Sequence, residues 1–166
     1  MKGLGTGRRP DRSRGAAMAV EPQLSASLED YLEAIYHIEA EKNAARAKDI
    51  VQRLGVHNSS VTQALRSLSD KGLVNYAPYD LVTLTDAGRD AAAGVVERHH
   101  ALRSFLVEVL GLDTAQAEHD ACRLEHDISP VLLERLRLLM DYRHRHPDEV
   151  VSWDTVRGGF AVAREG

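Results

Sequence analysis

The sequence contains a single cysteine, few aromatic residues and no long uncharged apolar run. One cysteine cannot form an internal disulfide, which excludes a disulfide-rich secreted scaffold and makes a reducing cytoplasm the expected compartment. Aromatic residues are 5% of the 166 residues, too few for a protein that binds single strands by stacking bases. No stretch approaches the roughly 20 apolar residues of a transmembrane helix, so we expect no membrane partner.

An excess of positive charge is also missing, since the formal net charge is −4. A polycationic nucleic-acid binder is therefore excluded, although a protein that contacts nucleic acid through one helix is not. The hydrophobic fraction of 43% is ample for a packed core and excludes a disordered chain. The N-terminal end differs in composition from the rest of the chain, because residues 1–20 hold five basic residues, one acidic residue and four glycines. This segment lacks the apolar core of a secretory signal. We expect residues 1–24 to form a disordered basic tail.

Apolar residues recur at helical spacing from Ser27 onward, and the breaks between them predict three helices. Serine and asparagine favour helix N-termini, and glycine favours the position after a helix. We place the helices at residues 27–42, 46–55 and 58–72, with Ser27 as the expected N-cap of the first and Asn58 or Ser59 as that of the third. Two β-like runs at 73–76 and 81–84 follow, separated by a turn candidate at 77–80. Three helices and a hairpin predict a winged helix-turn-helix domain over residues 25–86.

Longer helical patterns follow Thr85, so we predict a mainly α protein whose second domain is all-α. The helices are expected at 86–110, at 113–127, and from the Ser129-Pro130 start to about residue 146. Their apolar faces exceed what one small domain buries, which predicts a homodimer. We assign residues 87–146 to this dimerisation domain, which also holds the histidine, cysteine and glutamate residues considered below. Residues 147–166 lack clear periodicity and are predicted to be a C-terminal tail.

The third helix is the candidate DNA-reading element, because a helix-turn-helix places the N-terminal end of its second helix in the major groove. Its polar side chains suit contacts to phosphates and base edges. The candidate contact residues are Asn58, Ser59, Ser60, Thr62, Gln63 and Arg66. An ordinary capped surface helix is the alternative interpretation. Residues 25–86 hold six basic and nine acidic residues, so phosphate repulsion opposes binding unless a divalent cation offsets part of the charge.

A candidate metal site lies on the helix expected at 113–127. Cys122, Glu125 and His126 are spaced i, i+3, i+4 and project to one side, and Glu118 shares that side as an additional candidate. Thiolate, carboxylate and imidazole together are ligands for a first-row transition metal. The alternative is a small buried cysteine beside a solvated Glu–His pair.

Three more residues complete the candidate set. Asp30 and Glu33 are spaced i, i+3 on the first helix and face away from its apolar stripe, which alone is typical of a solvated acidic face. His99 lies in the apolar seam of the long helix, where a core histidine is the simpler interpretation. A chelate joining all three helices would fix the reading domain to the helical domain.

Five segments together carry a family resemblance. They are 28–36 (LEDYLEAIY), 45–50 (ARAKDI), 56–62 (VHNSSVT), 81–85 (LVTLT) and 121–126 (ACRLEH). The chain resembles the diphtheria toxin repressor/manganese transport regulator family over residues 25–145. The resemblance implies a cytoplasmic, homodimeric, metal-activated repressor that binds double-stranded operator DNA and controls metal uptake genes. The chain length implies the shorter, two-domain manganese-sensing architecture.

The resemblance also assigns ligands. Asp30, Glu33, His99, Glu125 and His126 match manganese-binding positions of the shorter branch, whereas Cys122 matches the iron-sensing branch. Glu118 falls where the iron branch has an ancillary-site histidine. Arg103 falls where that branch has an ancillary carboxylate, and an arginine cannot ligate a metal. The sequence is therefore a hybrid, for which Mn(II) is the expected metal and Fe(II) the second.

Two other classes of function are compatible with the sequence. A metal-independent winged-helix regulator that responds to a small organic ligand would bind its operator without divalent ions. An enzyme using Cys122 and His126 as nucleophile and base is disfavoured, because the sequence has neither a glycine-rich oxyanion loop nor a third orienting residue. We therefore do not expect an enzyme.

Overall fold

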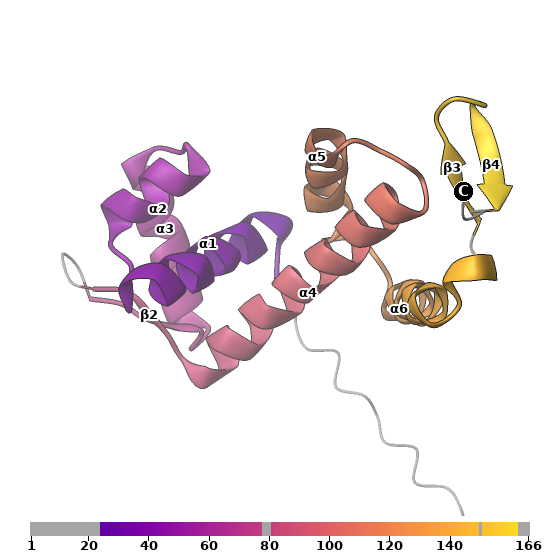
Figure 1. Ribbon diagram of the computed structural model, residues 1–166. Coiled ribbons are helices and arrows are strands. Elements are labelled where there is room, and N and C mark those ends of the chain that lie inside the picture. Colours follow the sequence, from indigo (N-terminus) through magenta and orange to yellow (C-terminus); the bar gives the residue numbers. More distant parts are fainter. Residues whose placement is uncertain (1–23, 78–80, 150, 163–166) are drawn as a thin grey trace, which may run out of the picture.

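The computed structural model describes residues 24–77, 81–149 and 151–162, which fold into two parts joined by one long helix (Figure 1). The N-terminal part is a winged helix-turn-helix. Its elements are α1 (Ala26–Lys42), α2 (Ala47–Leu54), α3 (Asn58–Asp70), β1 (Val74–Asn75) and β2 (Thr83–Leu84). The second part contains α4 (Asp86–Glu108), α5 (Thr114–Leu124) and α6 (Pro130–Arg145). The mainly α fold class with a winged N-terminal domain is confirmed.

The helix ends follow capping chemistry, with two corrections to the prediction. Ser25, rather than Ser27, caps α1, and its hydroxyl accepts the Leu28 N–H at 3.4 Å. The earlier start leaves Glu29 in the first turn, where the helix dipole favours an acidic side chain. His57 precedes α3 without a capping side-chain bond, so neither predicted cap, Asn58 nor Ser59, is used.

Apolar faces of α1, α2 and α3 form the core of the N-terminal domain, and β1 and β2 cover its edge as an antiparallel pair. A buried carboxylate ties this core to the next helix. Glu39 on α1 accepts the Leu84 N–H at 3.2 Å and pairs with Arg89 of α4 at 2.7 Å. Gly88 lets α4 approach the wing, because a Cβ at this position would lie 1.8 Å from the Leu73 carbonyl oxygen.

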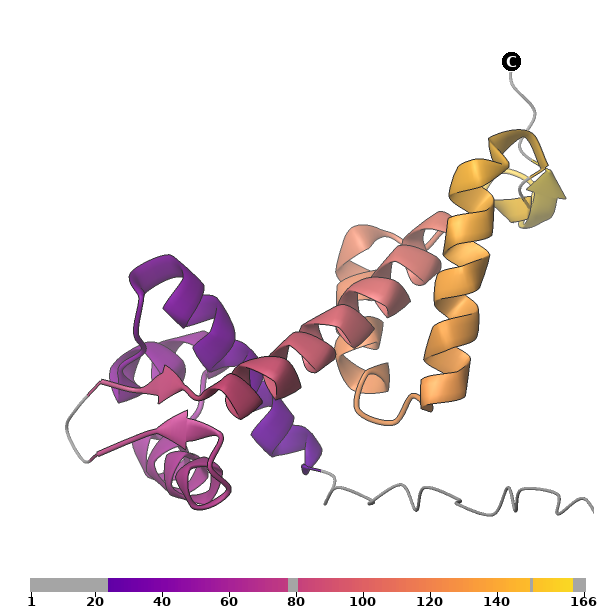
Figure 2. The ribbon, with the colours of Figure 1, turned by 90° about the horizontal axis from the view of Figure 1, so that it is seen from below.

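The helix α4 belongs to both parts of the molecule. Its Ala92 is buried in the N-terminal core, whereas Leu102 and Leu106 form a second core with Ala117 and Ala121 of α5. Figure 2 shows α4 running from the winged-helix domain into the α5–α6 layer. One continuous helix therefore connects the two domains.

The C-terminal segment differs from the predicted tail. Residues 151–162 form an antiparallel hairpin of β3 (Val151–Asp154) and β4 (Gly159–Val162) after a short 3-10 turn, Pro147–Glu149. The hairpin is attached to the helical domain, because Arg143 donates to the Val151 carbonyl at 2.7 Å and the Trp153 N–H donates to the Val109 carbonyl at 2.9 Å. Four-residue strands are too short to show a clear period in the sequence, and tertiary contacts of this kind leave no local pattern.

Some predicted features lie outside the described residues. These are residues 1–23 of the expected basic tail, most of the wing turn, 78–80, and residues 150 and 163–166 of the expected C-terminal tail. Leu24, the last residue assigned to that tail, is described and packs against the N-terminal core. Within the described ranges, the helices are all too short or too polar to span a bilayer.

Candidate metal centre

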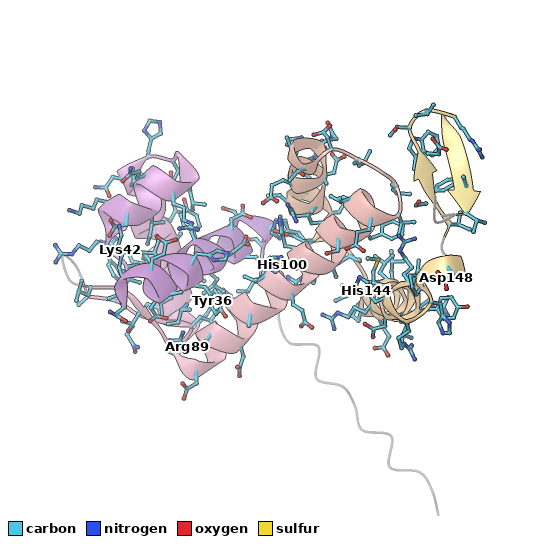
Figure 3. The ribbon with its side chains drawn as sticks, viewed as in Figure 1. Tyr36, Lys42, Arg89, His100, His144 and Asp148 are labelled. Carbon is cyan, nitrogen blue, oxygen red and sulfur yellow. The ribbon has the colours of Figure 1, made fainter. Side chains whose placement is uncertain are left out.

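Three candidate ligands meet where the N-terminal half of α1 lies against the end of α5. Asp30, Glu125 and His126 each offer one ligand atom, and these atoms lie within 4.8 Å of one another. His126 Nε2 is 3.0 Å from Asp30 Oδ1 and 3.5 Å from Glu125 Oε1. Side chains from α1, α4 and α5 crowd this junction beside the labelled His100 (Figure 3). The set therefore joins the winged-helix domain to the helical domain.

Glu125 gives the strongest indication that this cluster holds a cation. Its side chain is fully buried at the C-terminal cap of α5, and burial raises the pKa of its carboxyl group. Oε2 lies 2.7 Å from His99 Nδ1, but Oε1 has no hydrogen-bond partner. The 3.5 Å separation from His126 is a charge contact rather than a good hydrogen bond. A buried oxygen without a partner costs free energy, and a cation beside it would remove that cost.

His99 links Glu125 to the more exposed Glu118. His99 Nε2 lies 3.1 Å from Glu118 Oε1, and Arg103 Nε lies 2.8 Å from Glu118 Oε2. Both nitrogens of His99 thus face carboxylates rather than apolar core. Arg103 neutralises Glu118, which opposes a second cation of the iron-branch type at this place.

Glu33 and Cys122 lie near the cluster but outside the close set. Glu33 is half-buried, and its Oε1 lies 3.6 Å from His37 Nε2 on the next turn. Cys122 is exposed as a residue, yet partial burial of its thiol, followed by the charges of Glu125 and Asp30, raises its pKa. The structure does not bring these two side chains within ligand distance of the other three, so their candidacy as ligands rests on the sequence and its family resemblance.

The acidic surroundings shift the histidines toward their charged forms. The hydrogen bond with Glu125 outweighs burial and raises the pKa of His99. Burial alone would lower the pKa of His126, but the hydrogen bond with Glu29 and the charges of Asp30 and Glu125 raise it overall. Burial is the main cause of the raised pKa of Asp30. Without a cation, the cluster therefore retains protons that a metal must displace.

We expect Mn(II) affinity to fall as the pH falls through the raised pKa of His126. A metal binds the neutral imidazole, so below this pKa each displaced proton weakens binding by up to about tenfold per pH unit. The loss should begin above the ordinary histidine pKa of about 6.5. Calorimetric titrations in buffers with different ionisation enthalpies would count the released protons. A constant affinity between about pH 6 and 8 would contradict the expected shift.

Two residues of the junction were missed in the sequence. Glu29 Oε2 lies 2.7 Å from His126 Nδ1, and its Oε1 accepts a hydrogen bond from Arg98 at 2.8 Å. Glu29 counted only as one of the nine acidic residues of the reading domain, and Arg98 was not singled out. Their partners lie 69 and 97 residues away along the chain, so no local spacing could have indicated them.

The predicted reading helix presents its polar face away from the core. Val61, Leu65 and Leu68 of α3 are buried, whereas the candidate contact residues are exposed or half-exposed. A shallow hollow on this face is lined by Ser59, Thr62, Gln63, Arg66, Ser67 and Asp70. Lys42 and Arg53 pair with Asp49 and Glu41, but Arg66 has no ion-pair partner within the described ranges. Arg66 is therefore available for phosphate.

Taken together, the winged reading domain and the ligand cluster at its junction with a helical domain define a metal-dependent DNA-binding regulator. The comparisons agree with this class. Residues 23–82 match the model of the iron dependent repressor N-terminal DNA binding domain. Residues 85–154 match the iron dependent repressor metal binding and dimerisation domain. The chain belongs to the iron-dependent repressor family of transcriptional regulators.

Individual relatives support the same family. An HTH-type transcriptional regulator of Methanocaldococcus jannaschii is 40% identical over 71% of this chain and 95% of its own length. The HTH-type transcriptional regulator MntR of Listeria welshimeri is 35% identical over 74% of this chain and 85% of its own.

Two solved structures are similar in fold. A manganese-dependent transcriptional repressor in complex with manganese is 30% identical with a TM-score of 0.63, over 82% of this chain and 62% of that chain. The manganese regulator SloR is 27% identical with a TM-score of 0.63, over 69% of this chain and 54% of that chain. This chain therefore spans less than two thirds of either solved protein.

Proposed function

We propose that this protein is a manganese-activated repressor that binds operator DNA as a cytoplasmic homodimer and controls metal uptake genes. Fe(II) is the second candidate metal. The candidate ligands are Asp30, Glu33, His99, Cys122, Glu125 and His126, with Glu118 as an additional one. The carboxylates of Asp30 and Glu125 favour the harder ion Mn(II), and the similarity to a solved manganese regulator and a solved manganese-dependent repressor supports this order.

One observation carries the proposal: the close set of Asp30, Glu125 and His126 spans the two domains. Asp30 lies on α1 of the DNA-binding domain, and the other two residues lie at the end of α5. A bound divalent cation would supply positive charge between the carboxylates. Without it, the charge contacts of His126 only partly offset the repulsion between Asp30 and Glu125, so the two domains also sample other orientations.

DNA binding then follows from domain orientation. A dimer must present its two α3 helices to successive major grooves about 34 Å apart. Holding α1 against α5 selects one relative orientation. A coupling of ~1–3 kcal/mol between metal and DNA is enough for a useful switch, and it is reciprocal. Operator DNA should therefore tighten metal binding by the same factor.

The test is operator binding across a metal series. A labelled duplex would be selected from a random library with the Mn(II)-loaded protein, and its binding followed by fluorescence anisotropy under anaerobic, reducing conditions. We expect binding with Mn(II) and Fe(II), loss with a chelator, and no recovery with Mg(II) at the same concentration. Equal affinity with chelator present would overturn the proposal and favour a metal-independent regulator.

For DNA contact, we propose Asn58, Ser59, Ser60, Thr62, Gln63 and Arg66. Replacing Gln63 by alanine should change the preference at one base pair by ~1–3 kcal/mol, because its amide can read a base edge. Replacing Arg66 by glutamine should instead weaken binding to all sequences and reduce the salt dependence. Binding to single-base variants of the operator separates the two outcomes. A uniform loss for Gln63→Ala would reassign this residue to phosphate contact.

A further inference from the structure

A charged bridge connects the metal centre to the middle of α4. The guanidinium of Arg98 donates from Nε to the Glu125 carbonyl oxygen at 2.8 Å and from Nη2 to Glu29 Oε1 at 2.8 Å. The other oxygen of Glu29 lies 2.7 Å from His126 Nδ1. Arg98, Glu29 and His126 are 23%, 17% and 11% exposed in their side chains. The bridge thus joins α1, α4 and the end of α5.

The bridge determines which ring nitrogen of His126 carries the proton and which keeps a lone pair for a metal. A carboxylate only accepts hydrogen bonds, and Glu29 makes the shorter of the two close carboxylate contacts of the ring, 2.7 Å against 3.0 Å for Asp30. In the neutral ring, the proton is therefore favoured on Nδ1 beside Glu29. The lone pair of Nε2 then points toward Asp30 and Glu125, the other two members of the close set. Histidines that bind metals typically donate their second nitrogen to a carboxylate in this way.

Arg98 holds two parts of the cluster at once. One edge of its planar guanidinium orients Glu29, and through it His126, while Nε fixes the backbone of Glu125 at the α5 cap. A lysine carries the same charge but presents a single ammonium, so it cannot reproduce this forked pair of contacts.

We infer that Glu29 and Arg98 are positioning residues, which set the tautomer of His126 and hold α1 against α5 in the arrangement that receives the cation. This inference rests on the proposed metal-binding function. Neither residue is itself a candidate ligand. Both act before a metal arrives, so their effect is measurable in the metal-free protein.

The test compares three variants with a matched control. Glu29→Met removes both acceptor oxygens, Glu29→Gln keeps one, and Arg98→Lys keeps the charge without the fork. The control is Glu97→Gln, next to Arg98 on α4, because Glu97 is 62% exposed and pairs only with Arg137 in the described part of the chain. Exposed pairs of this kind contribute little.

Two readouts are required. Nitrogen chemical shifts of the histidine rings, recorded without metal at a pH where His126 is neutral, report the tautomer. Electron paramagnetic resonance of free Mn(II) gives the affinity. We expect Glu29→Met to populate both tautomers of His126 and to weaken Mn(II) binding about 10–100-fold. Glu29→Gln and Arg98→Lys should fall between this variant and the wild type, and Glu97→Gln should match the wild type.

The outcomes separate this inference from the proposed function. A wild-type protein that binds no Mn(II) would overturn both. Normal Mn(II) binding in the wild type, with an unchanged His126 tautomer and unchanged affinity in Glu29→Met and Glu29→Gln, would overturn only the positioning roles. A lower affinity without a tautomer change would also overturn the assigned role, because it would indicate loss of charge alone.

Discussion

Replacing Glu125 with glutamine is expected to lower Mn(II) affinity by more than about 100-fold, beyond the 10–100-fold typical of residues outside the ligand shell. Metal-dependent operator binding should be lost with it. The isosteric change removes the one fully buried carboxylate of the close set while keeping its volume. It thereby tests the charge of the cluster without opening a cavity.

The same substitution should leave the metal-free protein at least as stable as the wild type. Glu125 is buried with an unpartnered Oε1, and the ionised form pays a desolvation cost that a neutral amide avoids. Thermal melts with and without Mn(II) check both statements. We expect the metal-induced rise in melting temperature to disappear in Glu125→Gln and to persist in Asp90→Asn, a control at an exposed carboxylate of α4. A preserved rise in Glu125→Gln would remove this residue from the ligand set.

Asp30→Met is expected to weaken the Mn(II) response by about 100-fold and the Fe(II) or Co(II) response by less. A carboxylate favours Mn(II), whereas a thioether favours softer ions. Loss of a negative charge beside the cation lowers the affinity for every metal, so the ratio between metals is the informative quantity. The thioether is also the group that the iron-like branch is expected to carry at this position.

Operator titrations of wild type and Asp30→Met with each metal, under anaerobic and reducing conditions, would measure this ratio. The 42% exposure of the Asp30 side chain leaves room for the longer methionine without disturbing the core. An unchanged Mn(II) to Fe(II) ratio would mean that Asp30 does not select the metal. Its carboxylate would then belong to an ordinary solvated face.

Much of the fold was readable in the sequence because its signals are local. Gly55, Thr85 and the Ser129-Pro130 pair end or begin helices as predicted, since their capping chemistry depends only on adjacent residues. The hairpin at 151–162 was missed because its anchors, Arg143 and Val109, lie outside the strands. Its short strands form no detectable period of their own.

The candidate site was predictable in part. The spacing of Glu125 and His126, and of Asp30 on the first helix, came from helical geometry, and the family resemblance joined them. The sequence could not predict the residues that contact and orient the candidate ligands. Glu29 and Arg98 acquire their roles only when three helices meet, and Arg103 turns Glu118 from a free carboxylate into a paired one.

Because α4 is shared by both domains, a small rotation at one of its ends produces a larger displacement at the other. With 23 residues, α4 spans about 34 Å, so a rotation of only about 1° at one end moves the other by about 0.6 Å. A shift of about 0.5 Å is already enough to spoil a hydrogen bond between a side chain and a base edge. The junction must therefore hold the angle between the two domains to within about 1°. This requirement is stricter than any requirement on the strength of its individual contacts. Bending of α4 between Ala92 and Leu102 would be amplified at the DNA surface in the same proportion.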